Sequence, residues 1–357
     1  MPDPGPGRRW ARRARALPWQ LRAAALVAVL AAVALAAAGL ATPPAKQPQV
    51  LWGAWIGRQF DGVEPPADWT AVRAFEQRNA GGKRISVLNW SSPFSSDSCG
   101  GPCLFDVRSF RRVRHRGAIP FFSWANGGIP DRDVAAGGQD DYQRAWAKAA
   151  KAWGKPFFLR FAWEMNAPWF SWGVGNAGTT ARDYVAMWRH VHDVFARVGA
   201  RNVTWVWCPN ADPHRRFADV ARLYPGDRYV DWTCLDGYNA DNPWTSFTSL
   251  FARSYDRITR KVAPTKPMIV GEVGSTEGGG RKARWIADMM AALPKRFPRI
   301  RGLLWFDKVE VGPNGATDWP IESSPASSAA FAAGVRRDTF ASGTFSRIDD
   351  APIVPAG

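Results

Sequence analysis

The sequence predicts an α/β protein: a (β/α)8 TIM barrel preceded by an N-terminal signal peptide or membrane anchor. Short apolar segments and helix-like segments alternate eight times between residues 50 and 335. Several of the apolar segments end in acidic or aromatic side chains, at the strand ends where functional groups collect in this fold. Ahead of them, 19 uncharged, mostly apolar residues fill positions 23–41.

The N-terminal region has the organisation of an export signal. The basic segment 1–22 carries six arginines, and residues 23–41 form a hydrophobic segment in which Gly39 and Ala41 offer a cleavage site. The same segment is just long enough to span a bilayer, so a cleaved signal and a retained anchor are both open. Either way we expect export of the remainder, secreted or held on the outer face of the cytoplasmic membrane.

Residues 42–49 are proline-rich and predict a linker, residues 50–336 the barrel, and residues 337–357 a poorly ordered tail. The predicted strands are Val50–Ile56, Ile85–Trp90, Ala118–Trp124, Pro156–Phe161, Val203–Cys208, Tyr229–Tyr238, Pro267–Glu272 and Gly302–Phe306. The predicted helices are Ala67–Asn79, Asp106–Arg116, Asp140–Trp153, Thr180–Val198, Phe247–Val262, Arg281–Leu293 and Pro325–Val335.

Two of these elements illustrate the reasoning. Pro156–Phe161 is apolar except for Arg160 and is too short for a helix, which favours a buried strand. In Thr180–Val198 the apolar residues recur with a period of 3.6, as expected for a helix with one buried face. Thr179 or Thr180 can cap its start, and Gly199 ends it.

The predicted strand ends would bring aromatic and acidic side chains to one rim of the barrel. We expect about half of them to contact a ligand, because indole N–H groups buried in a barrel need partners. These residues are Trp55, Trp90, Trp124, Glu164, Trp207, Asn210, Asp236, Tyr238, Glu272, Trp305 and Asp307.

Two glutamates lie at the ends of different predicted strands: Glu164 just after one, and Glu272 as the last residue of the other. Glycoside hydrolysis uses two carboxyl groups, one as acid/base and the other as nucleophile or base. Trp169 and Trp172 lie near the first glutamate, and aromatic rings stack on the apolar faces of sugars. The pair therefore predicts a glycosidase acting on a polysaccharide, although each residue alone fits an ordinary packing role.

Composition excludes several other classes of protein. The chain has 357 residues, 20 Trp, four His and four Cys, and its positive charges are scattered, with no nucleic-acid-binding motif. No Cys/His spacing resembles a metal site, so we expect neither a metal nor a cofactor. A serine hydrolase would need a Gly-x-Ser-x-Gly elbow and a usable histidine, yet none of the four histidines, including His214, follows a predicted strand directly. We expect a monomer.

Export would permit disulfides. Cys99 and Cys103 bracket a Gly-Gly-Pro loop and are expected to bridge, whereas Cys208 and Cys234 either bridge or simply pack.

The residues around both glutamates resemble glycoside hydrolase family 26, a β-mannanase family of retaining barrel glycosidases. The resemblance covers most of Val50–Val335. It is sharpest over Leu159–Gly173, where the matching residues are Arg160, Glu164, Met165, Asn166, Trp169, Phe170, Trp172 and Gly173. A second segment matches at Pro267, Glu272 and Gly274, and a third at Leu235-Asp236-Gly237-Tyr238. The fourth contains Trp305-Phe306-Asp307, followed by Asp318-Trp319.

The resemblance implies roles for these residues. Glu164 would be the acid/base, Glu272 the nucleophile, Tyr238 a hydrogen-bond donor to that nucleophile, and Trp305 the sugar platform beside the scissile bond. The implied reaction is endo-β-1,4-mannanase-like hydrolysis by double displacement. The residues expected to bind substrate are Arg160, Trp163, Asn166, Trp169, Trp172, Trp207, Tyr238, Trp305 and Trp124.

Two positions depart from the family pattern. Trp163 replaces the histidine that precedes the acid, and Ala167 replaces the glycine that follows Asn166. That histidine contacts sugar beside the cleaved bond, so xylan, mixed-linkage glucan and bacterial exopolysaccharides are alternative substrates. A non-catalytic carbohydrate-binding barrel is a further alternative, but it would not need both glutamates.

Overall fold

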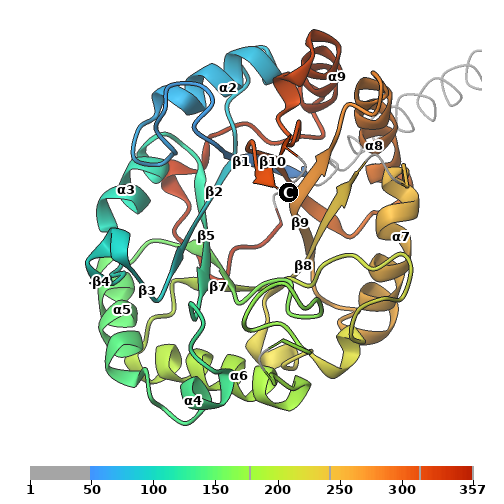
Figure 1. The fold of residues 1–357 in the computed structure, drawn as a ribbon. Coiled ribbons are helices and arrows are strands. Elements are labelled where there is room, and N and C mark those ends of the chain that lie inside the picture. Colours follow the sequence, from blue (N-terminus) through green and yellow to red (C-terminus); the bar gives the residue numbers. More distant parts are fainter. Residues whose placement is uncertain (1–48, 177, 241–242, 313–314, 356–357) are drawn as a thin grey trace, which may run out of the picture. The chain divides into compact units, whose positions relative to one another are not determined.

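Eight parallel strands close into a barrel in the computed structural model, which describes residues 49–355 except 177, 241–242 and 313–314 (Figure 1). Around the barrel the strand order is β1-β10-β9-β8-β7-β6-β5-β2. The strands are β1 (Leu51–Ile56), β2 (Val87–Pro93), β5 (Ile119–Ala125), β6 (Phe157–Phe161), β7 (Val203–Trp207), β8 (Trp232–Asn239), β9 (Met268–Ser275) and β10 (Ile300–Asp307).

Helices surround this barrel, as Figure 1 shows. They are α2 (Thr70–Ala80), α3 (Val107–His115), α4 (Asp131–Ala135), α5 (Asp140–Trp153), α6 (Ala181–Val198), α7 (Phe247–Arg257), α8 (Lys282–Arg296) and α9 (Pro325–Val335). A π-helical turn, Ile258–Val262, extends α7. The (β/α)8 prediction is confirmed. Between β7 and β8, where the sequence predicted no helix, the described chain has only the 3-10 turns Val220–Arg222 and Asp227–Tyr229.

Helix α6 begins and ends where its capping residues predict. Thr180 and Asp183 form a reciprocal capping box at its start, which satisfies backbone N–H groups that have no partner within the helix. At its other end Gly199 adopts φ 77°, a left-handed conformation that glycine reaches without a Cβ penalty. The structure therefore selects Thr180 over Thr179 as the cap.

The C-terminal segment packs against the rest of the barrel domain, contrary to the prediction of a poorly ordered tail. Its backbone pairs with Val50, which donates to the Thr339 carbonyl and accepts from the Ala341 N–H. Farther along, Ile353 is buried, and its carbonyl accepts a 2.6 Å hydrogen bond from the Trp232 indole. The sequence prediction failed because the tail is held by isolated contacts, which have no periodic signature.

Both pairs of cysteines are joined in the structure. The Cys99–Cys103 bond closes a small loop that contains the two-residue strand β4 (Gly101–Pro102), which pairs with β3 (Ser95–Ser96). The Cys208–Cys234 bond links the segment after β7 to the middle of β8. Two further short strands, β11 (Val311–Gly312) and β12 (Gly315–Ala316), follow β10.

The predicted export segment, residues 1–41, lies outside the described residues. Among the helices that the structure does describe, none has the length and hydrophobicity to cross a membrane.

One buried acid outside the cleft makes stability depend on pH. Asp131, at the start of α4, is only 2% exposed, and Asn126 donates a 3.0 Å hydrogen bond to one of its oxygens. Its other oxygen has no hydrogen-bond partner in the described part of the chain. Burial, with a smaller contribution from the negative charge of Asp183, raises the pKa of Asp131 to about 7.

Because this folded-state pKa lies above the unfolded value of 3.8, Asp131 stabilises the fold at low pH, and that contribution is lost as the pH rises through 7. We compare the free energy of unfolding of Asp131→Asn with that of wild type. We predict that the difference shifts in favour of the variant by about 2–3 kcal/mol when the pH is raised from 5 to 8. Urea unfolding at both pH values measures this difference. A constant difference between the two proteins would contradict the assignment.

Candidate active site

A cleft of about 630 Å³ opens where the C-terminal ends of β6, β8 and β9 meet the loops that follow β7 and β10. Carboxyl groups and aromatic rings share its walls, which is the composition expected of a sugar-binding site. Its lining includes Trp55, Trp163, Glu164, Trp169, Phe170, Asn210, Asp212, His214, Arg216, Phe217, Tyr238, Glu272, Phe306, Lys308, Glu310 and Trp319.

Glu164 lies three residues beyond the end of β6, in a tightly turned segment. Ala162 has φ 41° and Glu164 has φ 54°, left-handed values that cost energy for residues with a Cβ. The Glu164 N–H donates to the Cys208 carbonyl at 2.6 Å, which fixes this turn against the next strand segment. This strained turn therefore directs the Glu164 carboxyl group into the cleft.

Two donors hold the Glu164 carboxyl group. The Asn210 amide donates to one oxygen at 2.9 Å, and the Trp169 indole donates to the other. Asn210 is itself positioned by Asn166, which accepts from its backbone N–H at 2.8 Å and donates to its carbonyl at 2.9 Å. Asn166 is 1% exposed, so it orients the group that holds Glu164 without lining the cleft.

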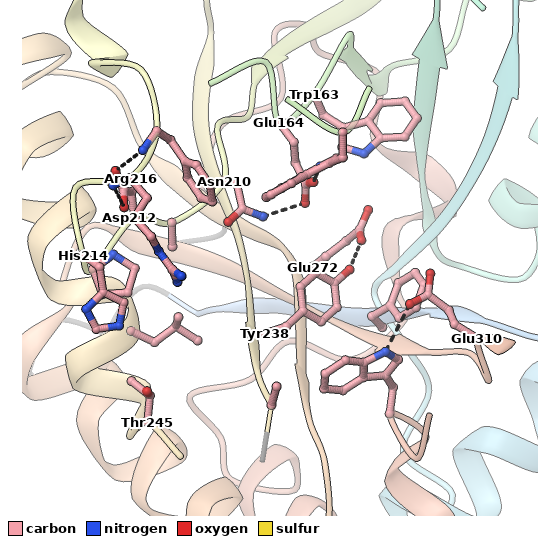
Figure 2. A pocket seen from close by; sticks show the side chains of 18 of the residues that line it. Trp163, Glu164, Asn210, Asp212, His214, Arg216, Tyr238, Thr245, Glu272 and Glu310 are labelled. Atoms are coloured by element: carbon pink, nitrogen blue, oxygen red, sulfur yellow. Dashed lines mark hydrogen bonds between the residues drawn. The ribbon is translucent and has the colours of Figure 1, made fainter. Parts of the chain in front are cut away.

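Glu272, on β9, points toward Glu164 from the opposite side of the cleft floor (Figure 2). The Tyr238 hydroxyl donates to one of its oxygens, and the Arg160 guanidinium donates to the other. The residue before it must be small. A Cβ on Gly271 would lie 2.6 Å from the Cys234 sulfur and 2.8 Å from an Asp236 oxygen, so only glycine allows this close packing.

Arg160 is fully buried and connects three strands through one guanidinium. It donates to Ser123 on β5 at 2.8 Å, to Asp236 on β8 at 2.7 Å and to Glu272 on β9. Its charged carbon also lies 4.8 Å from the centre of the Trp163 ring, close enough for a cation–π contact. Burial alone lowers the pKa of Arg160, but Asp236 and Glu272 outweigh burial and raise it, so the side chain stays charged.

Three carboxyl groups face this single cation. One oxygen from each of Glu164, Asp236 and Glu272 can be chosen such that all three lie within 4.8 Å of one another. One guanidinium cannot neutralise three carboxylates in a buried site, so the cluster favours retention of a proton. Burial, and then the charge of Glu272, raise the pKa of Glu164 to about 7. Burial likewise raises the pKa of Asp236 despite its contact with Arg160.

The same three acids are the described residues best placed to hold a cation at this site. Arg160 already supplies the positive charge there and occupies hydrogen-bonding positions on two of them. Asp236 also lies beside Cys208 and Cys234, but these sulfurs are bonded to each other and offer no thiolate ligand.

The structure brings together most of the residues that the sequence predicted for the site. Glu164, Glu272, Trp163, Trp169 and Tyr238 line the cleft. Arg160 and Asn166 lie directly behind it and contact the lining residues. Trp172 is buried one layer further back, where its indole donates to the Trp163 carbonyl at 2.6 Å, so the expectation that it binds substrate directly needs correction.

Three other tryptophans predicted to bind substrate also lie outside the cleft lining. Trp124, Trp207 and Trp305 are completely buried. Trp124 packs on α5 and α6 through Trp146 and Phe195. Trp305 packs on α8 and α9 through Trp285 and Phe331, and the Trp207 indole donates to the Leu223 carbonyl.

The reason for this correction is the alternation of side chains along a strand. Successive residues point to opposite faces, so a strand-end tryptophan has two possible directions that the sequence does not distinguish. On β10 Trp305 faces the helices, and the next residue, Phe306, faces the cleft instead. Trp319, in the loop after β10, also lines the cleft, and its carbonyl accepts the Trp305 indole N–H at 2.9 Å.

Sequence reasoning missed the wall formed by the loop after β7. Asp212, His214, Arg216 and Phe217 line the cleft, although the two charged residues and the histidine gave no motif. Asn210 had been noted at a strand end, but not as a partner of Glu164. The only indication in the sequence was the position of this segment, which directly follows a predicted strand and therefore lies on the functional side of a barrel.

The fold and the site share the arrangement of barrel glycosidases, in which two carboxyl groups lie in an aromatic cleft. Residues 141–303 match the model of Glycosyl hydrolase family 26. This match agrees with the resemblance that the sequence motifs indicated.

Two curated relatives have similar sequences. Endoglucanase H of Acetivibrio thermocellus is 32% identical over 292 residues, which are 78% of this chain but only 29% of that protein. Mannan endo-1,4-beta-mannosidase of Bifidobacterium adolescentis is 30% identical over 88 residues, 24% of this chain and 9% of that protein. This chain therefore spans less than a third of the length of either relative.

Solved structures share the fold at low sequence identity. The modular endo-beta-1,4-mannanase of Cellulomonas fimi superimposes with a TM-score of 0.62 at 19% identity, covering 87% of this chain and 75% of that one. The catalytic domain of the GH26 endo-beta-1,4-mannanase of Bacillus sp. JAMB-750 gives a TM-score of 0.60 at 20% identity, covering 85% and 90%.

Removing the buried cation should damage the fold as well as the site. We predict that Arg160→Met lowers the free energy of unfolding by about 3–5 kcal/mol, because Asp236 and Glu272 would remain buried without a counter-charge. Urea unfolding near pH 7 measures the loss. Arg201→Gln, at an exposed arginine, serves as the control. A loss below about 1 kcal/mol for Arg160→Met would mean that the acids are neutral without it.

Proposed function

We propose that the protein is a retaining endo-β-glycanase, with Glu272 as the nucleophile and Glu164 as the acid/base. The observation that carries the proposal is the short separation of the two carboxyl groups, which have oxygens within 4.8 Å of each other. Retaining glycosidases place these groups about 5–5.5 Å apart, whereas inverting enzymes leave about 6.5–9.5 Å for a water molecule.

The surroundings of each acid support its role. Arg160 and Tyr238 both donate to Glu272 and stabilise its ionised form, which attacks the anomeric carbon. Glu164, with a pKa of about 7, retains a proton near neutrality and donates it to the leaving oxygen. Glu164 then removes a proton from water, which hydrolyses the glycosyl-enzyme, and the configuration at the anomeric carbon is retained.

The first substrate we propose is β-1,4-linked mannan, on the basis of the match to the family model and the mannanases among the relatives. A second candidate, β-glucan, is favoured by a specific observation. The relative that aligns along most of this barrel is an endoglucanase, and Trp163 lines the cleft where the family pattern has a histidine. Release of reducing sugar from mannan, xylan and β-glucans distinguishes these candidates. No release from any of them would favour a carbohydrate-binding barrel.

Export remains part of the proposal, supported by the arginines before residue 23 and the hydrophobic segment 23–41. We also propose that the protein acts as a monomer. Fractionation of the producing cells tests export, and recovery of the protein in the cytoplasm would contradict it.

Loss of the proposed nucleophile should abolish turnover. We predict that Glu272→Ala lowers kcat/KM by at least about 10³-fold, because no glycosyl-enzyme can form. Glu310→Gln is the matched control, since Glu310 lines the same cleft without contacting the proposed catalytic pair, and it should retain activity within about tenfold. Equal losses in the two variants would remove Glu272 from its assigned role.

The pH profile should report the protonation of Glu164. A general acid must carry its proton, so we predict that activity falls as the pH rises above about 7. The Trp169 indole stabilises the carboxylate form and lowers this pKa, so Trp169→Phe should move the alkaline limb to higher pH while keeping an aromatic ring.

Trp55→Phe is the control for this experiment, because Trp55 lines the same cleft but its indole donates to Glu64 and not to Glu164. Rates of hydrolysis between pH 4 and pH 10 measure the effect. If the alkaline limb moves equally in both variants, or in neither, Glu164 does not set it.

A further inference from the structure

The cleft wall formed after β7 carries two basic side chains that the proposed hydrolysis does not use. His214 and Arg216 both line the cleft and are exposed to solvent. Within the described part of the chain, neither side chain has a hydrogen-bond, ion-pair or ring partner. Figure 2 shows them together on one side of Glu164 and Glu272, whereas Glu310 lies on the other side.

The nearby acid, Asp212, contacts the backbone of Arg216 and does not pair with its guanidinium group. Asp212 accepts from the backbone N–H groups of Arg216 and Phe217 at 2.8 and 2.9 Å, and therefore closes the turn that presents them. The other cationic side chain of the cleft is already matched, because Lys308 donates to Glu64 at 2.8 Å and lies over the Trp55 ring. Among the described residues that line the cleft, Arg216 is thus the positively charged side chain without a partner, and it lies beside His214.

The segment 212–218 is held at both ends. The Asp212 N–H donates to the Ser254 hydroxyl at 2.9 Å, and the Ala218 N–H donates to the Asn166 carbonyl at 3.0 Å. Between them, Phe217 packs edge-on against Trp169 at 5.1 Å. Trp169 is 48% exposed, so an open aromatic face lies next to the segment that carries His214 and Arg216. A sugar that stacks on this wall would bring its substituents near Arg216.

We propose that His214 and Arg216 form a subsite for a carboxylate group on the polysaccharide, so that the preferred substrate is an acidic, uronate-bearing β-glycan. This inference rests on the proposed function and specifies its substrate class. A guanidinium matches the two oxygens of a carboxylate in shape and charge. The acids Glu272 and Glu310 repel a carboxylate elsewhere in the cleft, which restricts it to this wall.

The test compares binding of a charged and a neutral form of the same polymers. The probes are carboxymethyl and hydroxyethyl derivatives of mannan and of β-glucan at equal degrees of substitution. Binding is measured in a Glu272→Ala background, which prevents cleavage. At low ionic strength we expect about fivefold tighter binding of the carboxymethyl form, decreasing in about 0.5 M salt as the charges are screened.

Arg216→Gln should abolish this preference while leaving affinity for the hydroxyethyl polymer within about twofold. Arg215→Gln is the matched control, because Arg215 is the adjacent exposed arginine and lines a different depression with Asp219 and Arg257. The subsite would be overturned if the Glu272→Ala protein, with His214 and Arg216 intact, bound both polymer forms with equal affinity. Equal losses of affinity for the carboxymethyl polymer in the two arginine variants would also overturn it.

Turnover separates this inference from the proposed function. Hydrolysis without a preference for the carboxymethyl polymer overturns the subsite alone. A preference that depends on Arg216, without hydrolysis of any polymer, supports the subsite and overturns the glycosidase mechanism.

Discussion

The contact between Arg160 and the two acids of β8 and β9 is the interaction on which the site depends. A single guanidinium, completely buried, joins Ser123 on β5, Asp236 on β8 and Glu272 on β9, and so ties three strands of the barrel wall to one point. Buried charges are unfavourable unless they are paired and hydrogen-bonded, and here each partner is both. The positions of the proposed nucleophile and of its neighbours follow from this one arrangement.

The same contact gives Glu272 different hydrogen-bond partners from those of Glu164. Arg160 and Tyr238 compensate Glu272, whereas Glu164 has two neutral donors, Asn210 and Trp169. Two carboxyl groups in one pocket therefore occupy different electrostatic environments. Such a difference is how a single site supplies an acid and a nucleophile at the same pH. The strained turn at Ala162 and Glu164 keeps them close in spite of their mutual repulsion.

Much of the fold could be predicted from the sequence because its signals are local. Strand lengths, the periodicity of α6 and its capping residues depend on near neighbours in the chain, and the structure matches them closely. The two glutamates could be located because each follows a short apolar strand, and parallel strands in a barrel end at the same rim. Neither inference required knowledge of how side chains pack.

The features that the sequence did not predict depend on the face of the strand to which a side chain points and on tertiary packing. Trp305 and Trp124 turn toward helices, whereas Phe306 and Trp319 reach the cleft, and sequence position alone does not resolve this choice. The loop with His214 and Arg216 has no motif, since its shape comes from Asp212 capping its own backbone. The C-terminal segment was likewise missed because single contacts such as that between Ile353 and Trp232 fix it.

A covalent intermediate on Glu272 is the most direct test of this account. The enzyme is incubated with an activated 2-deoxy-2-fluoro-β-glycoside of the sugar that it hydrolyses, digested, and mapped by mass spectrometry. We predict one added glycosyl group on the peptide that contains Glu272. A glycosyl group on another residue, or inhibition without a covalent adduct while turnover inverts the anomeric configuration, would contradict the central role of this carboxylate pair.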